Sequence, residues 1–263
     1  MQSIVNIVNV LTASAVQQFK TSIARPMFRF CVIAQPIIFG LLLGFMYMEK
    51  TSEDFTVYAL LGSGLASFWG SICFSSASDI HRERWYGTLE NIYAAPIGFK
   101  WIVLGKIIGN SVWGFLSLCL SFTVVSIFFN KTLIVAHPII LIAGILLMTF
   151  SLVAIGFLFA ALFTLSRNAR VMMNFMEYPV YILCGMLFPL ELLPKILYPI
   201  SYSFSPTWAV KIIRFSVSGG ELNSVLFYFA GLIIITVIYS ILSVVMFNRI
   251  DVKCRIDATL EVY

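Results

Sequence analysis

The sequence predicts an all-α integral membrane protein with six transmembrane helices. Of its 263 residues, 60% are hydrophobic and only 11% are charged, whereas soluble domains carry about 25% charged residues. The mean hydropathy is +0.96, and a water-soluble fold of this length could not hide so much apolar surface. The charged residues gather at the ends of long apolar segments, as expected for membrane-spanning helices.

Residues 1–25 are predicted to form an amphipathic helix in the membrane interface. Apolar residues recur at the i, i+3 and i+4 spacing of one helix face: Ile4, Ile7, Val8, Leu11, Ala15 and Phe19. Polar residues interrupt them on the other faces: Asn6, Asn9, Gln17 and Gln18. The start lacks the basic region and continuous apolar core of a signal peptide. Pro26 is expected to break the chain before the first span.

Six apolar segments have the length of about 20 residues that a transmembrane helix needs. They are residues 30–48, 58–78, 101–129, 138–165, 171–188 and 225–247. The third and fourth exceed that minimum and are expected to tilt or protrude. The pairs Gly40/Gly44 and Gly105/Gly109 have G-x-x-x-G spacing, which allows close helix approach. Their favoured use is packing within the chain, and contact with a second chain is the alternative.

The segment at residues 189–220, before the last span, is too apolar for a free loop and too broken for a span. Four prolines interrupt it: Pro189, Pro194, Pro199 and Pro206. We interpret it as a re-entrant or interfacial helical pair on the outer side. The alternative is a folded cap that rests on the spans. No internal repeat or linker appears, so residues 1–263 are predicted to form one domain.

The distribution of basic residues predicts the orientation in the membrane. Of 17 Lys and Arg residues, 12 fall on one side: Lys20, Arg25, Arg29, Arg82, Arg84, Lys100, Lys106, Arg167, Arg170, Arg249, Lys253 and Arg255. The others fall on the opposite side: Lys50, Lys131, Lys195, Lys211 and Arg214. Since basic residues favour the cytoplasmic side, both termini, the tail at residues 248–263 and the loop at residues 79–98 are predicted to be cytoplasmic.

The loop at residues 79–98 is the one compact polar segment between long apolar ones. Gly87 can end one helix, and Thr88 can cap the next, with Glu90 in its first turn. An apolar and aromatic face would follow on this short helix: Leu89, Ile92 and Tyr93. Pro96 and Gly98 would stop it. Such a face is costly in water, so either another protein covers it or it packs under the chain's own spans.

These residues resemble the signature of a known family. The runs Arg82-Glu83-Arg84, Gly87-Thr88-Leu89-Glu90 and Ala95-Pro96 are similar to the signature of the ABC-2 family of ABC transporter permeases. The resemblance extends to the amphipathic N-terminal helix, the six spans and the broken segment that contains residues 188–194 and 205–207. Trp85-Tyr86 is bulkier than the family pattern and could alter the fit to a partner.

The resemblance implies that the loop is a coupling helix inserted into a groove of a cytoplasmic ABC ATPase. The residues so implicated are Arg82, Glu83, Arg84, Gly87, Thr88, Leu89, Glu90, Ile92, Tyr93 and Pro96. The N-terminal helix would be a gate or connecting helix on the same ATPase. The family also implies two permease chains around one pathway, as a homodimer or a heterodimer. The sequence has no G-x-x-x-x-G-K-[ST] phosphate loop, so ATP and Mg²⁺ would be bound by a separate ATPase.

Glu177 is the most informative single residue inside the predicted spans, because it is an acid in an apolar segment. An acid at this depth is costly and usually faces protein or water. It could line the translocation path together with Asn174, or it could be a structural residue bonded to Asn174 or to a basic side chain. His81 and His137 are far apart, and the five cysteines lack metal-ligand spacing. We therefore predict no metal site, no cofactor bound by this chain and no enzymatic activity of its own.

The predicted function is export of a hydrophobic or amphipathic compound from the cell: a drug, an antimicrobial peptide or a lipid-like molecule. The 24 phenylalanines could line such a path, although lipid contact and core packing explain them as well. A lipid-linked polysaccharide or teichoic acid is an alternative cargo, and a non-transport scaffold or assembly factor is an alternative function. The net charge of +5 fits an excess of basic residues on the cytoplasmic side and contact with anionic membrane lipids better than it fits nucleic-acid binding.

Overall fold

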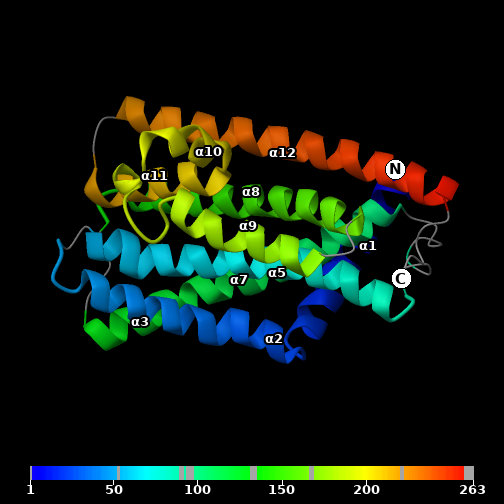
Figure 1. The fold of residues 1–263 in the computed structure, drawn as a ribbon, viewed down its shortest axis with the longest axis horizontal. Coiled ribbons are helices and arrows are strands. Elements are labelled where there is room, and N and C mark those ends of the chain that lie inside the picture. The colour runs from blue at the N-terminus through cyan, green and yellow to red at the C-terminus, as the bar shows by residue number, and fades with distance from the viewer. Residues whose placement is uncertain are drawn as a thin grey trace.

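A computed structural model describes residues 2–51, 54–88, 92, 98–130, 135–165, 169–219 and 222–257. Throughout these ranges the regular secondary structure is helical, without strands. Most helices run along one long bundle, and the start of α1, the end of α5 and the end of α12 lie at the same end (Figure 1). We name this the Asp79 end, and the opposite end, which carries α10 and α11, the Glu191 end.

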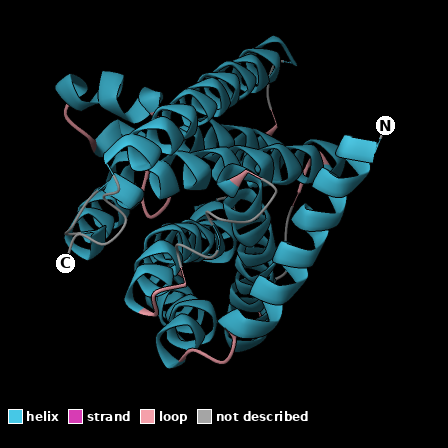
Figure 2. Ribbon diagram, turned by 90° about the vertical axis from the view of Figure 1, so that its right-hand side faces the viewer, coloured by secondary structure: helices cyan, strands magenta, loops and turns pink. Residues whose placement is uncertain are grey.

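The N-terminal helix α1 (Gln2–Ser22) lies across the Asp79 end rather than along the bundle (Figure 2). The chain breaks after it as predicted, and α2 (Pro26–Arg29) begins at Pro26. Arg25, before the proline, has extended backbone angles of φ −86° and ψ 122°, as the proline ring requires of its neighbour. The chain continues through the π-helical turn η1 (Phe30–Ala34) into α3 (Gln35–Tyr47).

The packed face of α1 overlaps the predicted apolar face and adds polar residues to it. Leu11 and Ala15 meet the glycines of α7, and the Phe19 ring stacks on Trp113. Gln18, expected on an outer face, is 2% exposed, while Val8, expected on the apolar face, is 51% exposed. The packed side carries Ser14, Gln18 and Ser22 at a spacing of four residues, and all three are buried. The burial of Gln18 was missed because it depends on polar partners in other helices, which periodicity does not reveal. The interfacial placement of α1 stays a prediction.

Five helical segments are long and apolar enough to cross a membrane, which confirms five of the predicted spans. They are Pro26–Tyr47, Phe55–Cys73, Phe99–Phe129, Pro138–Phe163 and Leu222–Ile250. The helices concerned are α2 to α3, η2 (Phe55–Gly62) with α5 (Ser63–Trp85), α7 (Phe99–Phe129), α8 (Pro138–Leu165) and α12 (Leu222–Asp257). The second segment begins as the π-helix η2 and becomes α-helical at Ser63.

The segment predicted as the fifth span is shorter than expected. Helix α9 (Ala169–Leu183) has 15 residues and contains Pro179. It ends before the expected limit at residue 188, and Gly185 follows with a φ of +68°, the left-handed conformation that commonly closes a helix. Fifteen residues rise about 22 Å, less than the hydrocarbon thickness of about 30 Å. The sixth crossing therefore stays a prediction.

The segment before the last span is helical but interrupted, as its prolines predict. It comprises η3 (Leu190–Leu192), η4 (Lys195–Leu197), α10 (Tyr198–Ser203) and α11 (Ser205–Ser218). Pro189 and Pro194 each precede a short 3₁₀ turn, and Pro199 and Pro206 lie in the first turns of α10 and α11. Helix α11 packs against α8 and α12. Whether the segment enters the bilayer stays a prediction.

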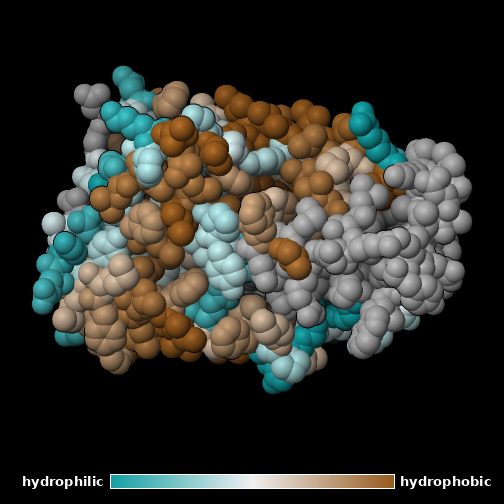
Figure 3. All heavy atoms as spheres, in the orientation of Figure 1, coloured by the Kyte–Doolittle hydropathy of each residue, from teal (hydrophilic) through white to brown (hydrophobic). Residues whose placement is uncertain are grey.

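The centre of the bundle is the helix formed by η2 and α5. Every residue of Phe55–Cys73 is buried, whereas only 17% of the most apolar window of α12 is. Helices α3, α7, α8 and α9 surround α5, which appears in cyan in the middle of Figure 1. The outward surface over α12, along the upper edge of Figure 3, is largely apolar. A surface of this kind is stable against lipid and not against water.

The Gly105/Gly109 pair of α7 is used for packing within the chain. A Cβ atom at Gly109 would lie 2.3 Å from the carbonyl oxygen of Ala15, and one at Gly105 would lie 2.8 Å from that of Leu11. Both contacts belong to α1, so the two glycines let its backbone approach α7 directly. Gly105 and Gly109 therefore allow α1 to pack closely against the bundle.

The Gly40/Gly44 pair of α3 also faces α7. Added Cβ atoms would lie 2.8 Å from Cγ2 of Val125 at Gly40 and 2.1 Å from the ring of Phe129 at Gly44. Both G-x-x-x-G pairs thus contact other helices of the same chain. Packing within the chain was the favoured prediction, and contact with a second chain was the alternative.

Candidate functional site at the Asp79 end

The polar segment that begins at Asp79 is helical at first, because α5 continues to Trp85. Gly87 then has a φ of +66°, a left-handed conformation that glycine adopts without steric cost. The backbone N–H of Thr88 donates to the carbonyl oxygen of Glu83 at 3.0 Å, the bond of a Schellman-type helix end. The prediction that Gly87 ends one helix is therefore confirmed.

Thr88 and Ile92, the next described residue, are joined by a backbone hydrogen bond. The backbone N–H of Ile92 donates to the carbonyl oxygen of Thr88 at 3.1 Å, which is the i to i−4 bond of an α-helix. The Ile92 side chain is half-buried and packs against the bundle's hydrophobic core. Four other predicted coupling residues lie outside the described residues, as does the side chain of Arg84: Leu89, Glu90, Tyr93 and Pro96.

Glu83 links the end of α5 to α7. Its carboxylate accepts a short hydrogen bond from Nζ of Lys106 and another from the hydroxyl of Thr88, and Arg82 Nη2 lies 3.7 Å from its Oε1. Burial, the largest influence, raises the pKa of Glu83. The two hydrogen bonds and the charges of Lys106 and Arg82 together outweigh burial, so this pKa lies below its usual 4.5. Glu83 is therefore an ionised anchor between the two helices.

Asp79 is the centre of a buried polar network that the sequence analysis did not find. Its Oδ1 accepts a hydrogen bond of 2.6 Å from Nη1 of Arg25. Its Oδ2 accepts bonds of 2.8 Å from the side-chain amides of Gln18 and Asn110. Arg82 Nη2 lies farther away, at 3.7 Å from Oδ1. Asp79 is 6% exposed, so these partners stabilise a carboxylate that burial would otherwise disfavour.

Ser22 completes the network and is fully buried. Its hydroxyl donates to Oδ1 of Asn110 at 2.6 Å and accepts from Nη2 of Arg25 at 2.6 Å. Since Ser22 and Gln18 lie on α1, Asp79 on α5 and Asn110 on α7, the network joins three helices. Asn110 inside a long apolar segment was the sequence signal that could have pointed to it, because a buried amide needs partners.

Glu177 lies in a second polar cluster, deeper in the bundle. It is 7% exposed, and its Oε1 accepts a hydrogen bond of 2.7 Å from the hydroxyl of Tyr181. Gln35 Nε2 donates to that hydroxyl at 3.2 Å. On α5, a Cβ at Gly70 would lie 2.9 Å from Glu177 Oε1 and 2.6 Å from Tyr181 Oη. The cluster therefore joins α3, α5 and α9, and the side chain of Asn174 lies outside the described residues.

Tyr181 and Gln35 were not among the residues selected from the sequence. Tyr181 follows Glu177 by four residues and so shares its helix face, which is a signal that the sequence did contain. Gln35 is 142 positions away from Glu177, and only the packing of α3 beside α9 brings it close.

Comparison with protein families identifies this arrangement. The model of the ABC-2 type transporter family matches residues 9–217, from α1 to the end of α11. Comparison with curated proteins gives no match. The family match covers well over half of the chain and includes α5, the Gly87 turn, both polar clusters and most of the interrupted segment before the last span. The chain is a multi-pass membrane permease that belongs to the ABC-2 type transporter family.

Proposed function

We propose that this permease exports a hydrophobic or amphipathic compound across the cell membrane, driven by a separate ATPase that docks at the Asp79 end. The family supports partnership with an ABC ATPase subunit. The proposal adds the direction of transport, the class of cargo and the docking surface. The docking residues are those of the predicted coupling helix, from Arg82 to Pro96.

The observation that carries the proposal is the continuity of α5. One helix runs from the buried centre of the bundle to the Gly87 turn, and its last turn carries the first predicted coupling residues, Arg82 to Arg84. Gly70 of this helix contacts the Glu177 cluster. Between Gly70 and Glu83 the helix rises about 20 Å, so a displacement at the turn reaches the intramembrane cluster through one rigid element. ATP-dependent differences in ATPase affinity for the turn would supply the energy.

The Asp79 network supports a shared movement of α1 and α5. It ties α1 to the last turns of α5 through Gln18, Arg25 and Asp79. A second contact fixes α1 on α7, where the Trp113 indole donates to the carbonyl oxygen of Phe19 at 2.9 Å. An ATPase that contacts α1 and the Gly87 turn would thus act on one connected unit.

The orientation rests on the distribution of charge and the position of the chain ends. The start of α1 and the end of α12 lie at the Asp79 end (Figure 1). The sequence assigns 12 of its 17 Lys and Arg residues to the same side as these two ends. Since positive residues favour the cytoplasm, the Asp79 end would face the cytoplasm and meet a soluble ATPase.

The class of cargo rests on the side chains around α5. Large buried residues there are mainly aromatic or aliphatic, including Trp69, Phe68, Phe159 and Phe163. Such surroundings suit an apolar or amphipathic molecule better than a highly charged polymer. A second permease chain, identical to this one in the proposed homodimer, would complete the path.

The test is purification of the tagged full chain from its native membranes, with measurement of bound ATPase and of transport. We expect a co-purifying polypeptide that contains a phosphate loop, and ATP-driven uptake of a fluorescent hydrophobic compound by inverted vesicles. Glu83→Gln and Glu90→Gln should uncouple transport or weaken ATPase association. Glu49→Gln, an exposed acid after the end of α3, is the control and should leave both unchanged.

Two outcomes would contradict the proposal. Wild-type transport and complex formation in both glutamate variants would refute the coupling assignment. A complex without any ATPase, and without stimulation of ATP hydrolysis, would favour a scaffold or assembly factor.

A further inference from the structure

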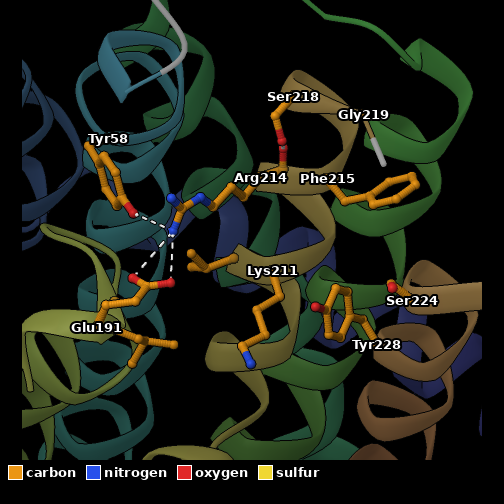
Figure 4. Close-up of a pocket in the computed structure, with 12 residues that line it drawn as sticks. Tyr58, Glu191, Lys211, Arg214, Phe215, Ser218, Gly219, Ser224 and Tyr228 are labelled. Carbon is orange, nitrogen blue, oxygen red and sulfur yellow. Dashed lines mark hydrogen bonds and ion pairs between the residues drawn. The ribbon is translucent and has the colours of Figure 1, made fainter. Parts of the chain in front are cut away.

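A cavity of about 330 Å³ opens at the Glu191 end, far from the proposed docking surface. It lies between η2, η3, α11 and α12, and its polar lining includes Tyr58, Glu191, Lys211, Arg214, Ser224 and Tyr228 (Figure 4). Ligand pockets usually measure about 300–1,000 Å³. The cavity is therefore large enough for a small polar group but lies at the lower limit for a drug-sized molecule.

Two cations of α11 enter this cavity in different directions. Arg214 points toward Tyr58 and Glu191 (Figure 4), and its Nη1 lies 3.2 Å from Glu191 Oε1 and 3.5 Å from the Tyr58 hydroxyl. Lys211 points away from them, beside Tyr228. Glu191 thus balances the charge of Arg214, and Lys211 leaves the lining with a net positive charge.

Lys211 is held by aromatic groups rather than by an acid. Its Nζ donates to the hydroxyl of Tyr202 and lies 4.2 Å from the ring centroid of Tyr202 and 5.4 Å from that of Tyr228. Within the described ranges, no ion pair joins Lys211 to a carboxylate. Aromatic faces attract a cation without neutralising it, so the ammonium group can still bind an anion.

The position of the cavity points to the membrane interface. Tyr202 and Trp208 contact each other at a centroid distance of 5.3 Å, and Trp208 contacts Phe227 at 5.6 Å. Tyr and Trp gather at the depth of lipid headgroups. On α12 beside the cavity, Leu222, Leu226 and Phe227 are each at least 64% exposed. A polar, positive cavity thus adjoins an outward apolar surface, and this combination matches an anionic lipid.

We propose that this cavity binds the headgroup phosphate of an anionic phospholipid from the adjacent leaflet. Lys211 would pair with the phosphate, Tyr228 and Ser224 would offer hydroxyl donors, and the acyl chains would lie along Leu222 and Leu226. The site is distinct from the proposed ATPase surface and does not depend on the identity of the cargo. Because free phosphate shares the chemistry of the headgroup, the test must separate the two sources.

The test uses the purified full chain in detergent and measures binding of dioctanoyl phosphatidylglycerol by calorimetry. Dioctanoyl phosphatidylcholine and inorganic phosphate are the comparison ligands. We expect phosphatidylglycerol to bind best and Lys211→Gln to weaken it about tenfold, the loss of one charge-assisted contact. Lys211→Arg should retain binding. Lys195→Gln, an exposed lysine that does not line the cavity, is the matched control and should have no effect.

Glu191→Gln gives an independent test with the opposite sign. It removes the acid that balances Arg214, so phosphatidylglycerol should bind several-fold more tightly. Because the Glu191 side chain is 69% exposed, this variant tests the cavity even if Lys211→Gln does not fold. The proposal is overturned if both charge changes leave phosphatidylglycerol binding unaltered. It is also overturned if inorganic phosphate binds as well as the lipid, because the ligand would then be a soluble anion.

Discussion

Replacing Asp79 by alanine should release α1 from the bundle. Asp79 accepts three hydrogen bonds of 2.6–2.8 Å from Arg25, Gln18 and Asn110. Its side chain is 8% exposed and that of Arg25 is 18% exposed. Removing one partner of a buried ion pair costs about 3–5 kcal/mol. Because Arg25 retains some contact with solvent, we expect the lower limit, about 3 kcal/mol.

Hydrogen–deuterium exchange of the purified chain measures this effect directly. A local destabilisation of about 3 kcal/mol accelerates exchange through local opening roughly a hundredfold. Peptides from α1 should show this increase in Asp79→Ala, and peptides from α8 should not. Glu191→Ala is the matched control, because its ion pair with Arg214 is exposed at 69% and 44% respectively and should contribute at most about 1 kcal/mol.

A double variant tests the cause. If the lost attraction between Asp79 and Arg25 is the main cost, Arg25→Met combined with Asp79→Ala should destabilise α1 by less than the sum of the single changes. Exchange of α1 within twofold of wild type in Asp79→Ala would refute the reasoning. Additive effects of the two single changes would show that the ion pair between Arg25 and Asp79 does not hold α1 on the bundle.

Three further predictions concern other contacts. Gly109→Leu should lower the thermal midpoint of the detergent-solubilised chain by an amount that corresponds to about 1–3 kcal/mol. The reason is that even a Cβ at this position would lie 2.3 Å from the carbonyl oxygen of Ala15. Gly98→Ala is the control and should be tolerated, because the nearest atom to a Cβ there is 3.9 Å away. The pKa of Glu83 is below its usual 4.5, so the stability lost in Glu83→Gln should be full above about pH 4.5 and shrink as the pH falls through the lower folded value; a difference independent of pH would contradict this. Glu177→Gln should impair vesicle transport at unchanged expression, and unchanged transport would remove Glu177 from the path.

The sequence predicted those parts of the fold that depend on local chemistry. Apolar length identified five segments that the structure confirms as long enough to span a membrane. Pro26 and Gly87 correctly predicted where one helix ends and the next begins, since each residue acts through its own backbone geometry. The exact end of α9 was missed because Gly185 closes the helix inside an apolar run that still looked like a span.

The polar networks could not be predicted in the same way. Gln18 and Asp79 are 61 positions apart, and Gln18 and Asn110 are 92 positions apart. No periodicity links residues at such separations, and only the packing of α1, α5 and α7 brings them together. The sequence placed Gln18 on another face than the apolar residues, whereas the structure buries it against Asp79.

The two occupied G-x-x-x-G pairs have a practical consequence for genetics. Gly40, Gly44, Gly105 and Gly109 each face a helix of their own chain. In a two-hybrid screen, where two copies must meet to produce a signal, substitutions at these positions would lower the signal by impairing the folding of each copy. Mutants recovered there would imitate association defects. A library designed to locate a contact between copies should therefore keep these four codons constant and vary the outward-facing positions instead.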